Sequence, residues 1–427
     1  PIMNRQILVT LLAAAVCTTL AGCQPSTPDY DTAEAPAAVA AASEPAATPA
    51  ATEAKAPMTD LEQLAQRLVT QSASVKEGEI VLIYGRQHDA ELLEDIAVNV
   101  RKVGAFPMVA YSSDRMSKRL LFDVPDQYDT QTNALAMKLA GIVDVVISLG
   151  NMTNENLFEG ADPKRMAARA KADEPVAKAW RSNNVRTVEV GNEMYPTSWR
   201  AKRFGMSEDE LARSFWNGVN IDYSQLQTRG EQIKTTIAGG DEIHITNPNG
   251  TDLKLRVKGR RVLVSDGIIS EADQKAGGPS LAAFLPAGEV YTTPVPGSAE
   301  GKVVHSRSYF HGKQIDNLTV TVSAGKVTGM TGSGPGYEDY KAEYDAIADE
   351  RKNEISFVNF GINPNVKLPA SSPVGAWMPA GSVSVGFGGN AWAGGENTLS
   401  YGTAVFLPGS TVTLDGKTIV EKGSLKL

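Results

Sequence analysis

Four short apolar runs, separated by polar stretches with helical periodicity, constrain the fold of this chain more than any other feature. The runs occupy residues 79–85, 106–112, 143–150 and 185–191. Residues 91–103 and 133–140, which lie between runs, have the length and pattern of crossover helices. Unbroken apolar strands that alternate with helices are typical of a parallel sheet covered on both faces. The pattern therefore predicts an α/β domain over residues 58–230.

Two local motifs predict where helices of this domain begin. Thr59-Asp-Leu-Glu62 and Ser207-Glu-Asp-Glu210 both have the pattern of a capping box, in which a hydroxyl and a carboxylate satisfy the first free backbone N–H groups. After each motif the apolar residues follow helical spacing, as Leu61, Leu64 and Leu68 do. We therefore expect a helix to open the folded part of the chain.

After residue 237 the pattern changes to strands with a period of two. Residues 241–246 and 253–257 alternate on either side of Asn247-Pro-Asn-Gly250, which is typical of a hairpin turn. Strand-like segments between glycine-rich turns continue to residue 427, interrupted by a charged segment that predicts a helix over 337–353. We therefore expect the α/β domain to be followed by a β-rich α+β domain over residues 231–427.

The first residues have the features of an export signal. Arg5 precedes an apolar run over residues 7–20, which is shorter than the roughly 20 residues that a spanning helix needs. The run ends in Leu20-Ala-Gly-Cys23, which resembles the lipobox of bacterial lipoproteins. Residues 1–22 are accordingly expected to be a signal peptide, and Cys23 to carry the lipid that anchors the chain to a membrane. The alternative is an ordinary signal peptide with a chance cysteine.

Residues 23–57 are expected to combine the lipidated Cys23 with a disordered tether rich in Ala and Pro. By the same resemblance, Gln24 after the cysteine favours the outer membrane, with the chain facing the periplasm. Once the signal is removed Cys23 is the one cysteine left, so a disulfide framework is excluded. The net charge of −8 argues against a nucleic-acid partner.

Generic catalytic motifs are missing from the sequence. One glycine follows the first apolar run, so the dinucleotide-binding fingerprint is absent, and no P-loop or G-x-S-x-G motif occurs. The four histidines, His88, His244, His305 and His311, form no H-x-x-x-H or H-x-D pair, and none follows residue 311. We expect all four to be structural.

A resemblance to a known family is carried by the C-terminal half. Its blocks begin with Leu285-Pro-Ala-Gly-Glu-Val-Tyr-Thr-Thr-Pro294 and continue with Asn359-Phe-Gly-Ile-Asn-Pro364, residues 381–390 and residues 394–403. In this order they resemble the aminopeptidase T family, also called thermophilic metalloaminopeptidases, over most of residues 60–427. The resemblance implies an α/β domain before a metal-binding domain, two metal ions that activate water, and a homodimer.

The resemblance also implies which residues would bind metal, and most of those residue types are replaced. Glu289 matches the first glutamate ligand of the family. The remaining ligand positions, which we expect to line the same cleft, are occupied by Asn359, Ser384, Gly389, Tyr401 and Thr403. These neutral residues cannot replace the carboxylate charge or the imidazole nitrogens that hold a pair of divalent ions.

Two hypotheses follow. In the first, the chain is a lipid-anchored, non-catalytic relative that uses no cofactor and keeps a cleft for a peptide, an amino acid or a partner protein. In the alternative, it is a metal-dependent aminopeptidase or other hydrolase, in which Glu396 joins Glu289 to hold Zn, Co, Mn or Mg. Convergent carboxylates would favour the alternative, whereas a hydrogen-bonded cluster of Glu289 with Asn359, Ser384 and Tyr401 would favour the first hypothesis.

Overall fold

The computed structural model describes residues 58–427 with the exception of residues 150 and 400. The predicted signal peptide, Cys23 and the tether lie outside the described residues, so their predictions stay untested. No helix in the described part of the chain combines the length and the apolar character needed to cross a membrane.

A five-stranded parallel sheet organises the N-terminal half, which confirms the predicted fold class. Its strand order is β2-β1-β3-β4-β8, and each neighbouring pair runs parallel. The strands are β1 (Ile80–Arg86), β2 (Phe106–Ser112), β3 (Val145–Leu149), β4 (Arg186–Val190) and β8 (Ala282–Leu285). The first four are the apolar runs of the sequence. The fifth, β8, comes from far beyond residue 230 and pairs with β4.

Helices cover both faces of this sheet, because its strands are apolar on both sides. Ile83 of β1 belongs to the same buried cluster as Leu93 of α3, whereas its neighbour Leu82 clusters with Val176 of α6. The α-helices are α2 (Leu61–Arg67), α3 (Ala90–Lys102), α4 (Asp114–Phe122), α5 (Ala134–Ala140), α6 (Pro163–Ser182), α7 (Ser198–Phe204), α8 (Glu208–Val219), α9 (Tyr223–Ala238), α10 (Glu271–Ala276) and α11 (Tyr337–Ala346). The short helical turns are η2 (Leu68–Ser72), η3 (Gln87–Asp89), η4 (Asp126–Tyr128), η5 (Gly278–Leu281), η6 (Glu350–Asn353) and η7 (Ala391–Ala393).

The C-terminal half contains two antiparallel sheets. The larger has the order β12-β11-β10-β6-β5-β16-β17-β18, and the central sheet has the order β15-β14-β13-β9-β7. Their strands are β5 (Glu242–Thr246), β6 (Asp252–Arg256), β7 (Val262–Ser265), β9 (Glu289–Thr292), β10 (Glu300–Phe310), β11 (Lys313–Ser323), β12 (Lys326–Ser333), β13 (Ile355–Gly361), β14 (Val383–Gly388), β15 (Gly402–Phe406), β16 (Thr411–Leu414), β17 (Lys417–Glu421) and β18 (Ser424–Leu425). The β-rich character predicted for this half is confirmed.

Two predictions that rest on short sequence motifs, a hairpin turn and a capping box, are confirmed, and two predicted helix ends are not. The turn at residues 247–250 joins β5 and β6, and Ser207 and Glu210 form the predicted capping box. At the first helix the cap is Asp60, whose carboxylate accepts from the Gln63 N–H, and not the predicted Thr59. Helix α11 ends at Ala346 rather than at residue 353, since the chain becomes extended at Ile347.

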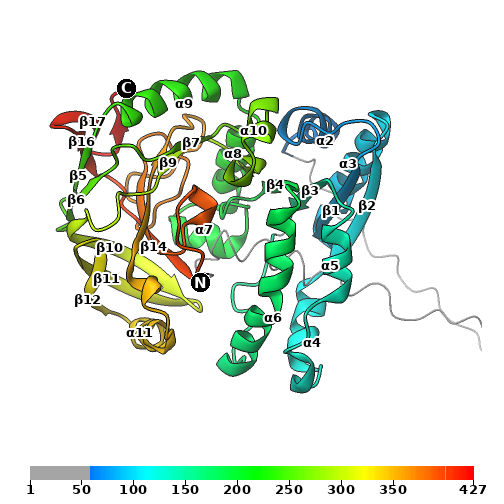
Figure 1. Cartoon of the computed structure of the whole chain (residues 1–427), viewed down its shortest axis with the longest axis horizontal. Helices are drawn as coiled ribbons and strands as arrows, with labels where there is room; N and C mark the ends of the chain where they lie inside the picture. The colour runs from blue at the N-terminus through cyan, green and yellow to red at the C-terminus, as the bar shows by residue number, and fades with distance from the viewer. Residues whose placement is uncertain (1–57, 150, 400) are drawn as a thin grey trace, which may run out of the picture.

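The connection between β8 and β9 brings the two halves together. Strand β8 closes one edge of the parallel sheet, and three residues later the chain enters the central sheet as β9. Figure 1 shows the parallel sheet and its helices beside the β-rich half, with α7 between them. Glu289, the first residue of β9, therefore lies at the junction of the two halves.

Candidate functional site

Glu289 is completely buried, and its carboxylate meets a side chain from the parallel sheet. The amide Nδ2 of Asn192, which follows β4, donates to Glu289 Oε1 at 3.0 Å and to the carbonyl of Pro286 at 2.9 Å. An amide that donates to a carboxylate is a charge-assisted hydrogen bond, one of the stronger kinds. Asn192 thus positions the glutamate without neutralising its charge.

The loop that presents Asn192 has an unusual backbone. Asn192 and Glu193 both have positive φ, at 40° and 62°, and Gly191 has φ 148°. A Cβ at Gly191 would lie 2.4 Å from Oδ1 of Asn151, so glycine is required there. Non-glycine residues with positive φ cost free energy and concentrate at functional sites. The loop also lies at the carboxyl end of a parallel strand, where α/β folds place their ligands.

Strand register places three of the predicted residues on one face of the central sheet. Glu289 is two residues from Tyr291, which pairs with Asn359, and Asn359 pairs with Ser384. Paired residues in an antiparallel sheet point to the same face, as do residues two apart on one strand. We call the side bearing Glu289, Tyr291, Asn359 and Ser384 the Glu289 face.

Neutral, buried groups dominate the Glu289 face. The amide Nδ2 of Asn359 donates to the carbonyl of Trp377 at 3.2 Å and to Ser384 Oγ at 3.4 Å. Asn359 is 1% exposed, and its Oδ1 has no hydrogen-bond partner among the residues that the structure describes. Trp377 in turn donates through Nε1 to Glu193 Oε2 at 3.0 Å. A buried acceptor without a donor is suited to an incoming N–H group.

Aromatic rings form a continuous row on this face. Tyr291 and Phe357 both contact Trp392, with ring centroids 5.3 and 5.0 Å apart, and Phe357 also contacts Trp377 at 5.6 Å. Trp377 also contacts Phe406, with ring centroids 4.8 Å apart. Such rings offer a large apolar contact area and a negative face that attracts cations.

Charge near Asn192 is predominantly negative. Glu189 Oε1 accepts from the Asn192 backbone N–H at 3.2 Å, so Asn192 contacts two carboxylates. Arg200 of α7 lies close enough to Glu193 and Glu189 to be stabilised by both, although burial lowers the pKa of its guanidinium to about 10. Two of these carboxylates act on the single guanidinium, and with Glu289 the negative charges near Asn192 outnumber the positive one, which favours a positively charged ligand over an anion.

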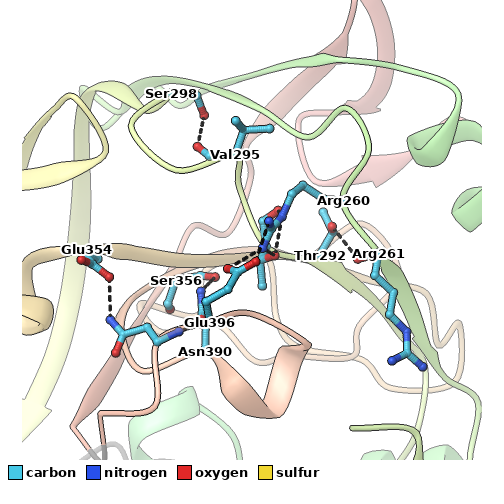
Figure 2. A network of polar contacts seen from close by, with 11 residues as sticks. Arg260, Arg261, Thr292, Val295, Ser298, Glu354, Ser356, Asn390 and Glu396 are labelled. Carbon is cyan, nitrogen blue, oxygen red and sulfur yellow. Dashed lines mark hydrogen bonds and ion pairs between the residues drawn. The ribbon is translucent and has the colours of Figure 1, made fainter. Parts of the chain in front are cut away.

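Glu396, the predicted replacement ligand, has a different partner. Both of its carboxylate oxygens accept from Arg260 at 3.0 Å, and the same guanidinium donates to Thr293 Oγ1, as Figure 2 shows for the Arg260–Glu396 pair. The Arg260 hydrogen bond lowers the pKa of Glu396, whose side chain is 72% exposed. A guanidinium that occupies both oxygens opposes cation binding at Glu396.

The structure places Tyr401 and Thr403 away from the Glu289 face. Thr403 pairs with Phe387, an odd number of residues from Ser384, so strand alternation points Thr403 to the opposite side of the sheet. The Tyr340 side chain of α11 interacts with both Thr403 and Tyr401, and burial raises the pKa of Tyr401 well above its usual value. Gly389 has no side chain to offer, and its N–H donates to the Tyr401 carbonyl at 2.8 Å.

These positions do not fit a pair of divalent ions. Among the described residues there is no group of three His, Cys, Asp or Glu side chains arranged to hold a metal ion. On the Glu289 face the positions that the resemblance assigns to metal ligands hold the amide of Asn359 and the hydroxyl of Ser384, which lack the charge and the nitrogen donors that such a site needs. The first hypothesis predicted a cluster of Glu289 with Asn359, Ser384 and Tyr401. Asn359 and Ser384 do share the face with Glu289, whereas Tyr401 interacts with Tyr340 of α11.

Histidine does not complete the site either. The ring of His305 on β10 lies 6.2 Å from that of Phe406 and is buried, which lowers its pKa to about 4. His244 and His311 pair with Asp252 and Glu343 at the surface, and His88 with Asp89.

Sequence reasoning missed Asn192, Glu193 and Trp377, which the fold brings to Glu289. A signal for the first two was present, since Gly191-Asn-Glu193 directly follows the fourth apolar run, and ligands bind at the carboxyl ends of parallel strands. Trp377 lies in an irregular segment between β13 and β14, where the sequence offered no pattern.

Comparisons with known proteins agree with this fold. The family model described as thermophilic metalloprotease (M29) matches residues 58–337. Among solved structures, wild-type AmpT from Thermus thermophilus is 16% identical with a TM-score of 0.65, covering 86% of this chain and 99% of its own. The 2,5-dihydroxypyridine dioxygenase from Pseudomonas putida KT2440 is 14% identical with a TM-score of 0.54, covering 86% and 96%. No curated protein matches the sequence.

Proposed function

This chain belongs to the thermophilic metalloprotease (M29) family, and we propose that it binds a peptide or an amino acid without cleaving it. The observation that carries the proposal is the contact between Asn192 and Glu289 on a face whose other former ligand positions are neutral. A two-metal site needs carboxylates and imidazoles that converge within bonding distance of the ions. Here the one retained carboxylate is held by an amide.

The extent of the family match supports this proposal. The matched residues, 58–337, include Glu289 but end before Asn359, Ser384, Tyr401 and Thr403. The family match therefore does not extend to the segment from which the remaining ligands would come.

The chemistry of the Glu289 face favours a ligand with an amino group and an apolar side chain. Glu289 and Glu193 supply negative charge, and the Asn359 Oδ1 supplies an acceptor. The rings of Tyr291 and Trp392 supply apolar contact and attract cations. A peptide with a free amino end, or a free amino acid, combines these features.

We further propose that Cys23 anchors the protein to the outer membrane, facing the periplasm. The support is the Leu20-Ala-Gly-Cys23 motif together with the composition of residues 24–57. Metabolic labelling with radioactive palmitate tests it. The wild-type chain should take up label and Cys23→Ser should not, whereas equal labelling of the two would contradict the anchor.

Catalysis is tested on purified residues 24–427, which keep every residue that the structure describes. We expect no stoichiometric metal by elemental analysis and no hydrolysis of leucine anilide with added Zn²⁺, Co²⁺ or Mn²⁺. Stoichiometric metal with turnover that Glu289→Ala abolishes would overturn the proposal in favour of the hydrolase.

Binding is tested by titration calorimetry with a leucine-initiated tripeptide and with its N-acetylated form. We expect the free tripeptide to bind and acetylation to weaken binding at least tenfold, since it removes the ammonium charge. Glu289→Gln should weaken binding by a similar factor. Glu396→Gln is the matched control, because Glu396 is paired with Arg260. Equal affinity for both peptides would contradict recognition of the amino group.

A further inference from the structure

The exposed surface of three neighbouring helices is strongly basic. Helices α5 and α6 pack against the same face of the parallel sheet, and α6 is tied to the end of α4 through Arg169, which donates to the Leu120 carbonyl at 2.7 Å. Of the nine exposed charged residues on α4, α5 and α6, Glu174 is the one anion. The eight cations are Arg115, Lys118, Arg119, Lys138, Lys164, Lys171, Lys178 and Arg181. The whole chain, in contrast, has a net charge of −8.

Helix α6 presents its cations as a regular stripe. Lys164, Lys171 and Lys178 are seven residues apart, so they lie on one side of the helix and span about 21 Å. The opposite side is buried through Val176 and Trp180. The lysine stripe therefore points directly away from the sheet.

Helix α4 repeats the arrangement on a smaller scale. Arg115, Lys118, Arg119 and Phe122 follow the spacing i, i+3, i+4 and i+7, and all four are exposed, whereas Leu121 is buried. Arg119 has an ion-pair partner in Asp123, just beyond the helix end. On α4, α5 and α6 the acidic residues are Glu174 and the partly buried Asp114 and Asp173. The other acidic residues of this layer lie in the loops and on the short turn η4.

Large apolar side chains are exposed among these cations. The most exposed are Phe122 at 40%, Tyr128 at 47%, Met137 at 38%, Ile142 at 56% and Met166 at 40%. Arg165 donates to the Val124 carbonyl at 2.8 Å, which keeps the start of α6, and hence Met166, beside the segment that carries Tyr128. Figure 1 shows α4, α5 and α6 extending together below the parallel sheet in this view.

We propose that the eight cations and five apolar residues named above, here called the basic face, dock the protein on a membrane surface of anionic phospholipid. Each Lys or Arg near such a surface adds binding free energy, and apolar side chains between them enter the region below the headgroups. Nucleic acid would be attracted by the charge and would stack on the ring of Phe122, but it gives no role to the aliphatic side chains of Ile142 and Met166. The rest of the chain carries a net negative charge and is repelled by an anionic surface, so the basic face turns toward the lipid.

The basic face is tested by co-sedimentation of residues 24–427 with large vesicles, so that no acyl chain contributes. We expect binding to vesicles of phosphatidylglycerol and phosphatidylcholine, little binding to phosphatidylcholine alone, and release by 0.5 M salt. Lys164→Gln, Lys171→Gln and Lys178→Gln together should lower the partition coefficient about fivefold for each lysine. Phe122→Ser with Met166→Ser should weaken binding without changing its salt dependence.

A second set of lysines provides the matched control. Lys258, Lys417 and Lys422 are exposed in the β-rich half, and their replacement by Gln changes the net charge equally. This triple variant should bind the vesicles as the unchanged protein does. Equal losses for both triple variants, equal binding to neutral vesicles, or binding to heparin or DNA with none to vesicles would each overturn the proposal.

Discussion

The amide of Asn192, in the loop after a strand of one sheet, donates at 3.0 Å to the buried carboxylate of Glu289, which opens a strand of another sheet. Asn192 follows β4 of the parallel sheet, and Glu289 opens β9 of the central sheet. This hydrogen bond, together with that from Trp377 to Glu193, therefore connects the two halves at the candidate site. The contribution of this hydrogen bond to stability, and the assignment of neighbouring side chains to the Glu289 face, can be tested separately.

Asn192→Ala removes a side-chain donor of the buried Glu289 carboxylate. We expect the free energy of unfolding to fall by about 1–3 kcal/mol, the typical cost of an unmet buried hydrogen bond, measured by urea denaturation. Gln127→Ala on the exposed turn η4 serves as control and should change it by less than about 0.5 kcal/mol. A loss equal to the control would show that Asn192 contributes nothing to the junction.

Asn359→Glu combined with Ser384→His should create a zinc site. With Glu289, the two new side chains would give three ligands on one face, the number that catalytic zinc sites use. We expect Zn²⁺ at 100 times its Kd to raise the free energy of unfolding by about 2.7 kcal/mol. Asn359→Glu with Thr403→His is the matched control, because Thr403 points to the opposite side. A zinc effect of equal size in both variants would refute the assignment of faces.

His305 should make the protein less stable in mild acid. Burial lowers its pKa to about 4 in the folded chain from 6.5, so the unfolded chain takes up the proton first as the pH falls. Stability from neutral His305 is present above pH 6.5 and is lost between pH 6.5 and pH 4. Between pH 7 and pH 5 this amounts to about 2 kcal/mol.

The measurement compares urea unfolding of wild type and His305→Phe at both pH values. Carboxylates with raised pKa, such as Asp173 and Asp266, both at about 6, act in the opposite direction, but they cancel in the difference between the two proteins. His311→Phe, at an exposed site, is the control. A wild-type pH dependence no steeper than that of His305→Phe would contradict the prediction.

The Arg260–Glu396 pair should contribute little to stability despite its bidentate geometry. Glu396 is 72% exposed, and exposed ion pairs are typically worth about 0.2–1 kcal/mol. A double-mutant cycle with Arg260→Met and Glu396→Gln should give a coupling energy in that range, smaller in 1 M salt. A coupling of several kcal/mol that salt leaves unchanged would mean that the pair behaves as a buried one.

Much of the fold was predictable because its signals are local. Residues 106–112 were predicted as a strand with the bounds that β2 has, and the turn at 247–250 connects the expected strands. The end of α11 was misplaced, because charged residues 347–353 suit both a helix and a surface turn. Strand β8 escaped notice, since its four residues carry no sign that they pair with β4 about a hundred residues earlier.

The site was predictable only where a motif preserved it. The resemblance identified Glu289, Asn359 and Ser384, and the register places them on one face. The resemblance could not indicate that Arg260 forms an ion pair with Glu396, because the two residues are 136 positions apart in the sequence. For the same reason the role of Asn192, 97 positions before Glu289, was visible only in the fold.

The short passage from β8 to β9 has a mechanical consequence. Three residues separate a strand that is hydrogen-bonded into the parallel sheet from Glu289 in the central one. Any change in the angle between the two halves must therefore be absorbed within residues 286–288, because the strands on either side are hydrogen-bonded into their own sheets. Glu289, the first residue after this connection, would then move with the central sheet, and its hydrogen bond to Asn192 would register the change directly.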